Sequence, residues 1–258
     1  MKGMRKAYME KGEVFTESQL VSQEPFEQFR DWFEIASKTP GIEEPNAMCL
    51  ATATKDGRPS ARMVLLKGYG PNGFKFFTNY KSRKASELDA NPYASLNFYW
   101  EPLKRCVRIE GKVEKLSTEE STEYFMSRPE SSRIGAIVSP QSQPIPSRDY
   151  LSEKQTELTQ LAQEKPEQIC KPENWFVTLN LSILFIIFKR VSLVSFASQR
   201  FYFRGGYIVV PDMIEFWQGQ TNRLHDRIRF RKLKPDDKPD NAVVHQGKNG
   251  WVYERLAP

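Results

Sequence analysis

Short apolar runs separated by turn signals limit the fold of this chain more than any other feature. Lys55-Asp56-Gly57, between the first two runs, is typical of a hairpin turn, and Pro102 lies between the last two. Strands that follow one another with short connections predict an antiparallel barrel or sandwich. The runs expected to form strands are 47–54, 60–67, 74–78, 93–100 and 105–113.

Helices are expected around these strands. Apolar residues recur at helical spacing within 24–38, and Ser82 can cap a short helix that runs to about Asp89. Ser117-Thr-Glu-Glu120 is a capping-box pattern, and 148–165 has the composition of a solvent-exposed helix. The expected class is therefore α+β, mainly β, in one domain over 23–258 behind a flexible arm at 1–22.

Composition favours a folded protein with an anionic partner. The chain has 258 residues, of which 39% are hydrophobic and 12% aromatic, and its net charge is +6. Acids and bases are interspersed, and no stripe of alternating aromatic and basic residues appears, so nucleic acid is the least favoured partner. Small phosphorylated molecules fit the charge best.

The cysteines and the N-terminal residues indicate whether disulfides, a metal site or a secreted protein should be expected. Cys49, Cys106 and Cys170 lie far apart, without a CxxC pair or a His/Cys cluster, so neither a disulfide framework nor a metal site is expected. The N-terminal residues lack the apolar core of a signal peptide, and a reducing cytoplasm is expected.

The stretch 215–227 contains several side chains that could bind a ligand or take part in catalysis. Arg223, His225 and Arg227 alternate, so in a strand their side chains would share one face. Two guanidiniums around an imidazole suit an anionic, planar ligand. The competing interpretation is the charged face of an edge strand.

Four other basic residues lie at positions that a purely structural role does not explain well. Arg62 and Lys67 lie at the two ends of one apolar run. Arg83 and Lys84 would lie in the first turn of a helix, where cations oppose the helix dipole unless an anion is nearby. Solvated charges remain the alternative for both pairs.

A third group of polar residues follows the capping box. Tyr124 and Arg128 are four apart, which places them on one face of a helix, and Ser132 follows Pro129. A hydroxyl, a guanidinium and a second hydroxyl on one side would form a phosphate clamp, although this signal is weak by itself.

These segments together resemble the pyridoxine/pyridoxamine 5'-phosphate oxidase family over nearly the whole chain. The matching runs are Asn46–Thr52, Ser60–Gly68, Phe76–Asn79, Ser82–Lys84, Phe98–Leu103, Ser127–Pro129, Glu215–Gly219, Arg223–Arg227 and Trp251–Pro258.

The resemblance implies a split β-barrel homodimer with FMN at the subunit interface. It implies oxidation of pyridoxine 5'-phosphate or pyridoxamine 5'-phosphate to pyridoxal 5'-phosphate, with molecular oxygen as acceptor and hydrogen peroxide as product. No metal, nucleic acid or membrane is expected to take part. The implied FMN contacts are Arg62, Met63, Val64, Leu65, Phe77, Thr78, Arg83, Lys84, Gln141, Ser142, Trp217 and Arg227. The implied substrate contacts are Lys67, Tyr124, Arg128, Ser132, Arg223 and His225, of which Arg223 and His225 would act at the substrate ring.

The chain departs from the family pattern twice. Cys106 stands where the family has Gln, so a flavin hydrogen bond is lost or replaced by a weak thiol donor. Residues 176–204 interrupt the family pattern between Trp175 and Gly205 with an apolar, Phe- and Ser-rich segment that contains no acid. Lys189-Arg190 cut its apolar run too short for a membrane span. The segment is expected to be a translated intron, because Phe201–Arg204 is what a pyrimidine tract and an AG acceptor would encode.

Other functions compete with the oxidase. Intact phosphate clamps around a distorted ring site would give a catalytically impaired isoform that only binds FMN or pyridoxal phosphate. A flavin reductase on the same barrel would consume NAD(P)H, but no nicotinamide fingerprint is present.

Deleting Phe176–Arg204 is expected to improve the protein. An exposed segment this apolar promotes aggregation, and a displaced neighbouring strand would misplace Trp217 and the arginines after it. The full-length chain should therefore give less soluble protein and lower turnover than the deletion variant, measured side by side. Equal yield and equal turnover would contradict this account. So would a comparison of transcript and gene in which one uninterrupted exon encodes the segment.

Overall fold

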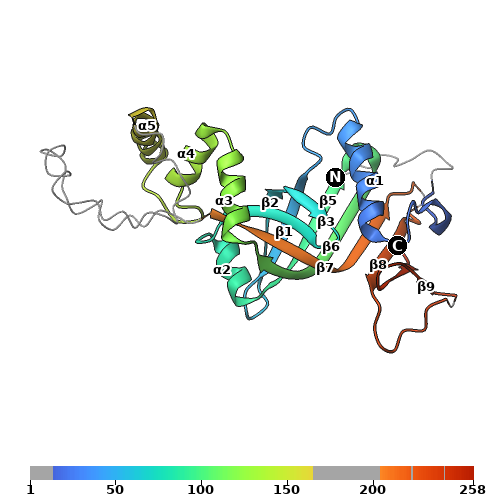
Figure 1. The fold of residues 1–258 in the computed structure, drawn as a ribbon. Helices are drawn as coiled ribbons and strands as arrows, with labels where there is room; N and C mark the ends of the chain where they lie inside the picture. Colours follow the sequence, from blue (N-terminus) through green and yellow to red (C-terminus); the bar gives the residue numbers. More distant parts are fainter. Residues whose placement is uncertain (1–13, 165–203, 222, 241) are drawn as a thin grey trace, which may run out of the picture. The chain divides into compact units, whose positions relative to one another are not determined.

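The computed structural model describes residues 14–164, 204–221, 223–240 and 242–258 (Figure 1). Most of the 176–204 insert lies outside the described residues, so the expected effect of the insert stays a prediction. Among the described helices, none is long and apolar enough to cross a membrane.

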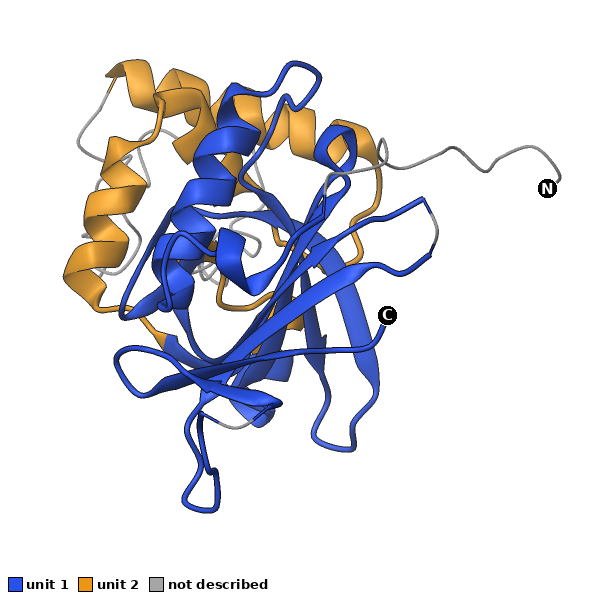
Figure 2. Ribbon diagram, turned by 90° about the vertical axis from the view of Figure 1, so that its right-hand side faces the viewer, with its two compact units in different colours: residues 1–76, 87–114, 207–258 blue, residues 77–86, 115–206 orange. Residues whose placement is uncertain are grey.

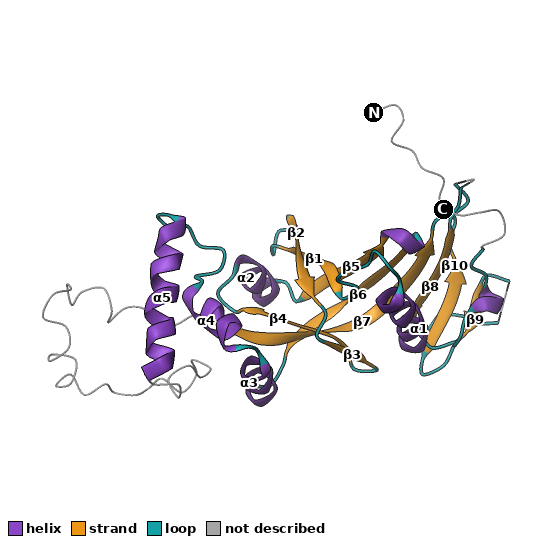
Figure 3. Ribbon diagram, turned by 90° about the horizontal axis from the view of Figure 1, so that it is seen from above, coloured by secondary structure: helices purple, strands orange, loops and turns teal. Residues whose placement is uncertain are grey.

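The predicted mixture of antiparallel strands and helices is confirmed (Figure 3). The helices are α1 Pro25–Lys38, α2 Arg83–Ala90, α3 Thr118–Ser127, α4 Glu130–Val138 and α5 Arg148–Glu164, with short 3-10 helices at Glu17–Gln19 and Glu101–Leu103. The strands are β1 Ala47–Ala53, β2 Pro59–Leu65, β3 Gly68–Gly70, β4 Gly73–Asn79, β5 Tyr93–Trp100, β6 Arg105–Lys115, β7 Arg204–Gln218, β8 Asp226–Lys232, β9 Val244–Gln246 and β10 Trp251–Arg255.

The strands form one sheet that is not closed among the described residues. Its order is β2-β1-β5-β6-β7-β8-β10-β9, and β4 pairs with β3 and β7. The β1–β2 hairpin is the one that the Asp56-Gly57 turn predicts, with Leu50 opposite Arg62. Because β2 ends the path, one of its edges is unpaired among the described strands.

The chain divides into two compact units (Figure 2). Unit 1 comprises Met1–Phe76, Glu87–Glu114 and Tyr207–Pro258, and unit 2 comprises Phe77–Ser86 and Lys115–Gly206. Each unit has its own buried residues, described in turn below.

The core of unit 1 lies between α1 and one face of the sheet. Along β1 and β5 every second side chain is buried, which is the period of a strand with one covered face. Phe29 of α1 is fully buried and its ring lies 4.9 Å from Phe74 and 5.3 Å from Phe98, centroid to centroid. Trp32 packs edge-on against Phe216. The amphipathic pattern of α1 therefore covers this core.

The described part of the expected N-terminal arm also contacts unit 1. Phe15 is 4% exposed, and its ring lies 4.9 Å from that of Trp32. Glu17 accepts hydrogen bonds from Arg255 at the end of β10, which joins the two ends of the described chain.

Unit 2 packs α3, α4 and α5 around a second small core. Phe125, Ile134, Ile137 and Ala162 are among its buried members. Ser117 caps α3 by accepting the Glu120 backbone N–H, as its sequence pattern predicts.

Three local expectations are wrong. The strand predicted at 60–67 ends at Leu65, so Lys67 lies after it. Stretch 215–227 is not one strand, because β7 ends at Gln218 and β8 begins at Asp226, which leaves Arg223 and His225 in the connection. The backbone leaves the ladder there, since the Gly219 N–H donates to the carbonyl of Lys104.

The third correction concerns the shared helix face of Tyr124 and Arg128. Arg128 is the C-cap of α3, with φ −78° and ψ 149°, so it is extended and not helical. Pro129 explains this, because its ring disfavours the helical conformation of the preceding residue.

Phe29→Ala is expected to be far more destabilising than Ile35→Ala on the same helix. Phe29 is 0% exposed among five aromatic rings, whereas Ile35 is 38% exposed. Removing a buried phenyl ring costs about 3–5 kcal/mol, and a surface change about 0.5 kcal/mol. Urea denaturation of both variants measures the difference, and equal losses of unfolding free energy would contradict the packing described.

Candidate cofactor and substrate sites

A buried ammonium group organises the polar residues of unit 2. Lys84, in the first turn of α2, is 8% exposed. Its Nζ donates to Thr78 Oγ1 at 3.1 Å and to Gln141 Oε1 at 3.0 Å. The Thr78 hydroxyl donates in turn to Gln141 Oε1 at 2.9 Å. Three of the residues predicted to bind FMN, from β4, α2 and the segment after α4, are thus in direct contact.

The start of α2 adds further groups that suit an anion. Ser82 precedes the helix and is fully buried, yet its Oγ has no hydrogen-bond partner among the described residues. The same holds for Nδ2 of the fully buried Asn79. The first N–H groups of a helix are also free of helical partners and carry partial positive charge. An anion bound here would accept from the Ser82 hydroxyl and the first N–H groups of the helix, beside the ammonium of Lys84.

Ser82 was predicted as a helix cap and missed as a site residue. The sequence signal was present, because a hydroxyl beside Arg83 and Lys84 at a helix start is typical of anion sites. What the sequence lacked was the burial, which comes from packing.

The remaining predicted residues of unit 2 lie on or beside its helices. The rings of Phe77 and Tyr124 stack with centroids 3.7 Å apart, which brings together a residue predicted for FMN and one predicted for substrate. Arg128 and Ser132 are half-buried on either side of Pro129, and the clamp they would form with Tyr124 stays a prediction.

Two further residues of the FMN set are exposed in unit 2. Arg83 is exposed next to Ser82. Ser142 is exposed with φ +70°, a left-handed conformation that is uncommon for a non-glycine residue and holds a sharp turn after Gln141.

Arg62 forms its hydrogen bonds with other residues of unit 1. Its guanidinium donates to Glu87 Oε2 at 3.1 Å and to Thr52 Oγ1 at 2.5 Å. Because side chains alternate along a strand, Arg62 and Val64 point to one face of the sheet and Met63 and Leu65 to the other. The four consecutive predicted contacts therefore cannot all be side-chain contacts with one flavin.

A row of side chains on one face of the sheet runs from β2 to β6 in unit 1. Met63 lies opposite Cys49, which lies opposite Asn97, which lies opposite Arg108. Directly opposite residues share a face. Met63 is 64% exposed on this face, so the row begins at an open edge.

Glu215 connects that row with the predicted flavin residue Arg227. Its carboxylate accepts from Arg108 Nη2 at 2.6 Å and from Arg227 Nε at 2.7 Å. The hydrogen bond to Glu215 raises the pKa of Arg227 above its ordinary value. Trp217 lies opposite Arg227 in the β7–β8 pair, and its ring centroid is 4.9 Å from that of His225. Glu215, which the sequence did not single out, fixes the position of Arg227.

The predicted substrate residues Arg223 and His225 lie in the short connection between β7 and β8. Gln220 contacts both of them through its backbone: its N–H donates to His225 Nδ1 at 2.9 Å, and its carbonyl accepts the Arg223 N–H at 3.2 Å. Arg223 has φ +67°.

The predicted gathering of Lys67, Arg128 and Arg223 around phosphates spans both units. Lys67 and Arg223 belong to unit 1, where Lys67 is exposed, and Arg128 belongs to unit 2. This part of the site stays a prediction.

Cys106 is a protonated donor and not a reactive thiolate. Its Sγ donates to Asn97 Oδ1 at 2.9 Å. Burial, and then the nearby charge of Glu215, raise the pKa of the Cys106 thiol to about 11. Its contact with flavin, implied by the family position, is a separate expectation.

Cys106 is expected to react slowly with iodoacetamide in the folded protein. A pKa of about 11 in place of 9.0 leaves about a hundredfold less thiolate at pH 8, and the thiolate is the nucleophile. Labelling should accelerate as the pH rises toward 11. Peptide mass spectrometry follows Cys106 separately from the other cysteines, with urea-unfolded protein as the control. Equal rates in folded and unfolded protein at pH 8 would contradict the raised pKa.

Comparisons with known proteins extend over both units. A family model described as pyridoxamine 5'-phosphate oxidase matches residues 38–162, and one described as the pyridoxine 5'-phosphate oxidase C-terminal dimerisation region matches 205–258. These two matches leave 163–204 between them, the region that contains the insert.

Two relatives and two solved structures agree with these matches. The chain is 53% identical to pyridoxine-5'-phosphate oxidase of Bos taurus over 256 residues, covering 99% of this chain and 86% of the bovine protein. It is 48% identical to pyridoxine/pyridoxamine 5'-phosphate oxidase of Bombyx mori, covering 99% and 88%.

Among solved structures, PhzG from Burkholderia lata 383, in complex with tetrahydrophenazine-1-carboxylic acid, matches with TM-score 0.67 and 25% identity over 95% of this chain and 98% of that one. A pyridoxamine 5'-phosphate oxidase-related, FMN binding protein from Nostoc punctiforme matches with TM-score 0.55 and 13% identity over 89% and 97%, which supports the split-barrel fold alone. The chain belongs to the pyridoxine/pyridoxamine 5'-phosphate oxidase family.

Proposed function

We propose that this chain oxidises pyridoxine 5'-phosphate and pyridoxamine 5'-phosphate to pyridoxal 5'-phosphate, with FMN as its cofactor. The family supports this activity, since the relatives that match the chain at 53% and 48% identity carry the name of this oxidase. The observation that carries the proposal in this structure is the buried Lys84 with Thr78, Gln141 and the unpartnered Ser82 hydroxyl.

The phosphate of FMN fits the groups around Lys84. A phosphate offers several acceptor oxygens and about two negative charges, which match an ammonium, a hydroxyl and free helix N–H groups. Thr78, Lys84 and Gln141 would hold it, with Ser82 at the helix start and Arg83 on the exposed side. The residues present therefore suit the cofactor that the family implies.

The isoalloxazine ring would lie against the face of the sheet that carries Met63, Trp217 and Arg227. Arg227 is held by Glu215, so its guanidinium keeps one orientation and can stabilise negative charge near it. Cys106 would replace the family's amide donor on this face with a weaker S–H donor.

The substrate contacts proposed for this chain are Lys67, Tyr124, Arg128, Ser132, Arg223 and His225. Lys67, Arg128 and the two hydroxyls would bind its phosphate. Arg223 and His225 would orient its ring, because they lie in one short connection beside Trp217. The chemistry that bound FMN would supply is acceptance of a hydride from C4' of the substrate, with molecular oxygen as the final acceptor and hydrogen peroxide as the product; with the amine substrate, water would release ammonia from the imine.

A homodimer with FMN at the subunit interface is part of the same proposal. The family model over 205–258 is described as a dimerisation region. On the open face of unit 1, Met63 is 64% exposed and Tyr99 is 52% exposed, as expected for apolar side chains that a second subunit covers. We also infer a cytoplasmic enzyme, since the described cysteines Cys49 and Cys106 are free thiols, as in a reducing compartment.

Lys84→Gln is expected to weaken FMN binding, and Lys81→Gln provides a matched control. Both lysines lie near the start of α2, but Lys84 is buried and Lys81 is exposed. Loss of a charged hydrogen bond of about 1.5–3 kcal/mol raises the Kd of FMN roughly 10- to 150-fold. Quenching of FMN fluorescence measures the Kd, and formation of pyridoxal 5'-phosphate from pyridoxine 5'-phosphate measures activity. An unchanged Kd in Lys84→Gln would contradict the proposed cradle, and a wild-type holoenzyme that forms no pyridoxal 5'-phosphate would contradict the activity.

A further inference from the structure

Gln220 holds the connection that carries the proposed substrate residues. Its backbone N–H donates to Nδ1 of His225, and its backbone carbonyl accepts from Arg223. Its side chain reaches in another direction, because Nε2 donates to Asp226 Oδ2 at 2.7 Å. Gln220 is 9% exposed, and its side-chain bond to Asp226 is buried, whereas its backbone bond to His225 is part-buried.

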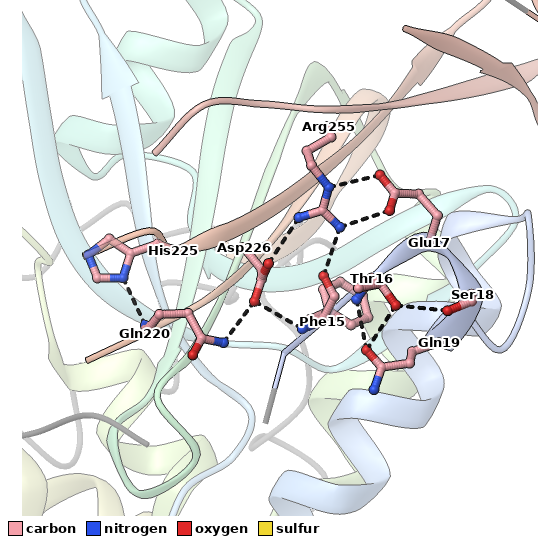
Figure 4. Close-up of polar contacts among 9 residues, drawn as sticks. All are labelled: Phe15, Thr16, Glu17, Ser18, Gln19, Gln220, His225, Asp226 and Arg255. Carbon is pink, nitrogen blue, oxygen red and sulfur yellow. Dashed lines mark hydrogen bonds and ion pairs between the residues drawn. The ribbon is translucent and has the colours of Figure 1, made fainter. Parts of the chain in front are cut away.

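Asp226 is the acceptor on which three segments of unit 1 converge (Figure 4). Its Oδ2 accepts from Gln220 Nε2 and also from the backbone N–H of Phe15 at 2.9 Å. Its Oδ1 accepts from Arg255 Nη1 at 2.9 Å. Asp226 is 8% exposed, and a buried carboxylate with three donors is held in one orientation.

The N-terminal segment and the last strand complete this arrangement. Arg255 donates to Asp226 and also to the Phe15 carbonyl and both carboxylate oxygens of Glu17. These bonds tie Phe15 and Glu17 to β10 at the point where β8 begins (Figure 4).

We propose that Gln220 and Asp226 are positioning residues that hold His225 as the neutral tautomer with its proton on Nε2, and that the N-terminal segment around Phe15 and Glu17 helps to hold them. Nδ1 of His225 accepts a backbone N–H, so it carries no proton. In the neutral ring the proton is then on Nε2, which makes Nε2 the hydrogen-bond donor of the ring. The other tautomer, with its proton on Nδ1, would offer an acceptor at Nε2 in its place.

This inference rests on the proposed function for its catalytic consequence, but the tautomer can be measured without activity. The chain contains only two histidines, His225 and His245, so nitrogen-15 spectra of histidine-labelled holoenzyme show two imidazoles. A His245→Gln variant assigns them. At pH 8 the chemical shifts of the two ring nitrogens report which of them carries the proton.

Gln220→Ala and Asp226→Asn are the test variants. Alanine removes the bond to Asp226, and asparagine offers one acceptor oxygen where the carboxylate has two. The matched controls are Gln246→Ala, at an exposed glutamine, and Asp237→Asn, at the acid paired with Arg231. Thermal denaturation of each holoenzyme confirms that the variants compared are folded.

The expected result is an Nε2-protonated His225 in the wild type and in both controls, and a mixture of tautomers in the two test variants. A KM for pyridoxine 5'-phosphate raised several-fold, with kcat/KM lowered by up to on the order of 100-fold, should accompany the mixture. A wild-type His225 protonated on Nδ1, or test variants with the wild-type spectrum, would overturn the inference. Lost tautomer control with unchanged kinetics would support the positioning and contradict the proposed substrate role of His225.

Discussion

The burial of the Lys84 ammonium is the constraint on which the proposed chemistry depends. An ammonium with 8% exposure requires partners, and Thr78 and Gln141 provide neutral oxygens at hydrogen-bond distance. A phosphate beside this ammonium would form a charge-assisted hydrogen bond with it and would also accept from the N–H groups at the start of α2. The unpartnered Ser82 hydroxyl at the start of α2 strengthens this conclusion, because buried polar atoms are rarely left unsatisfied.

In unit 1, buried carboxylates hold the arginine side chains in position. Glu215 fixes Arg227 and Arg108, Glu87 fixes Arg62, and Asp226 fixes Arg255 together with Gln220. Each of these acids is less than 9% exposed as a residue, so its carboxylate holds the arginine from the buried side, while the arginine side chains stay 20–42% exposed. A site built this way keeps its geometry before a ligand arrives, which is a source of catalytic power in enzymes that orient a cofactor and a substrate.

How far the sequence predicts this structure depends on whether the signal is local. The apolar run at 47–54, the capping serine at 117 and the amphipathic pattern of α1 are local signals, and each predicted its element. The Arg223–His225 connection was wrong as a strand, because the left-handed conformation of Arg223 and the bond from Gly219 to Lys104 depend on the fold around them. The prediction that Arg128 is helical was wrong, although the proline that follows it in the sequence disfavours a helical conformation at Arg128.

Some site residues could be proposed from the sequence, but the contacts between them could not. Lys84 was predicted as an anion ligand from its place at a helix start, but its contact with Gln141 joins segments far apart in the chain. Gln220, Asp226 and Glu215 were inside a stretch already singled out, yet their roles follow from hydrogen bonds that only the folded chain shows.

The central claim is that the predicted cations bind two phosphorylated aromatic molecules, FMN and the substrate. A crystal structure of the protein with FMN and pyridoxal 5'-phosphate tests it most directly. The account predicts Lys84 within about 2.7–3.2 Å of the FMN phosphate, and Lys67 and Arg128 on the second phosphate with Arg223 and His225 at the ring. Lys67, Arg128 and Arg223 in separate parts of the assembled protein, away from either ligand, would contradict it.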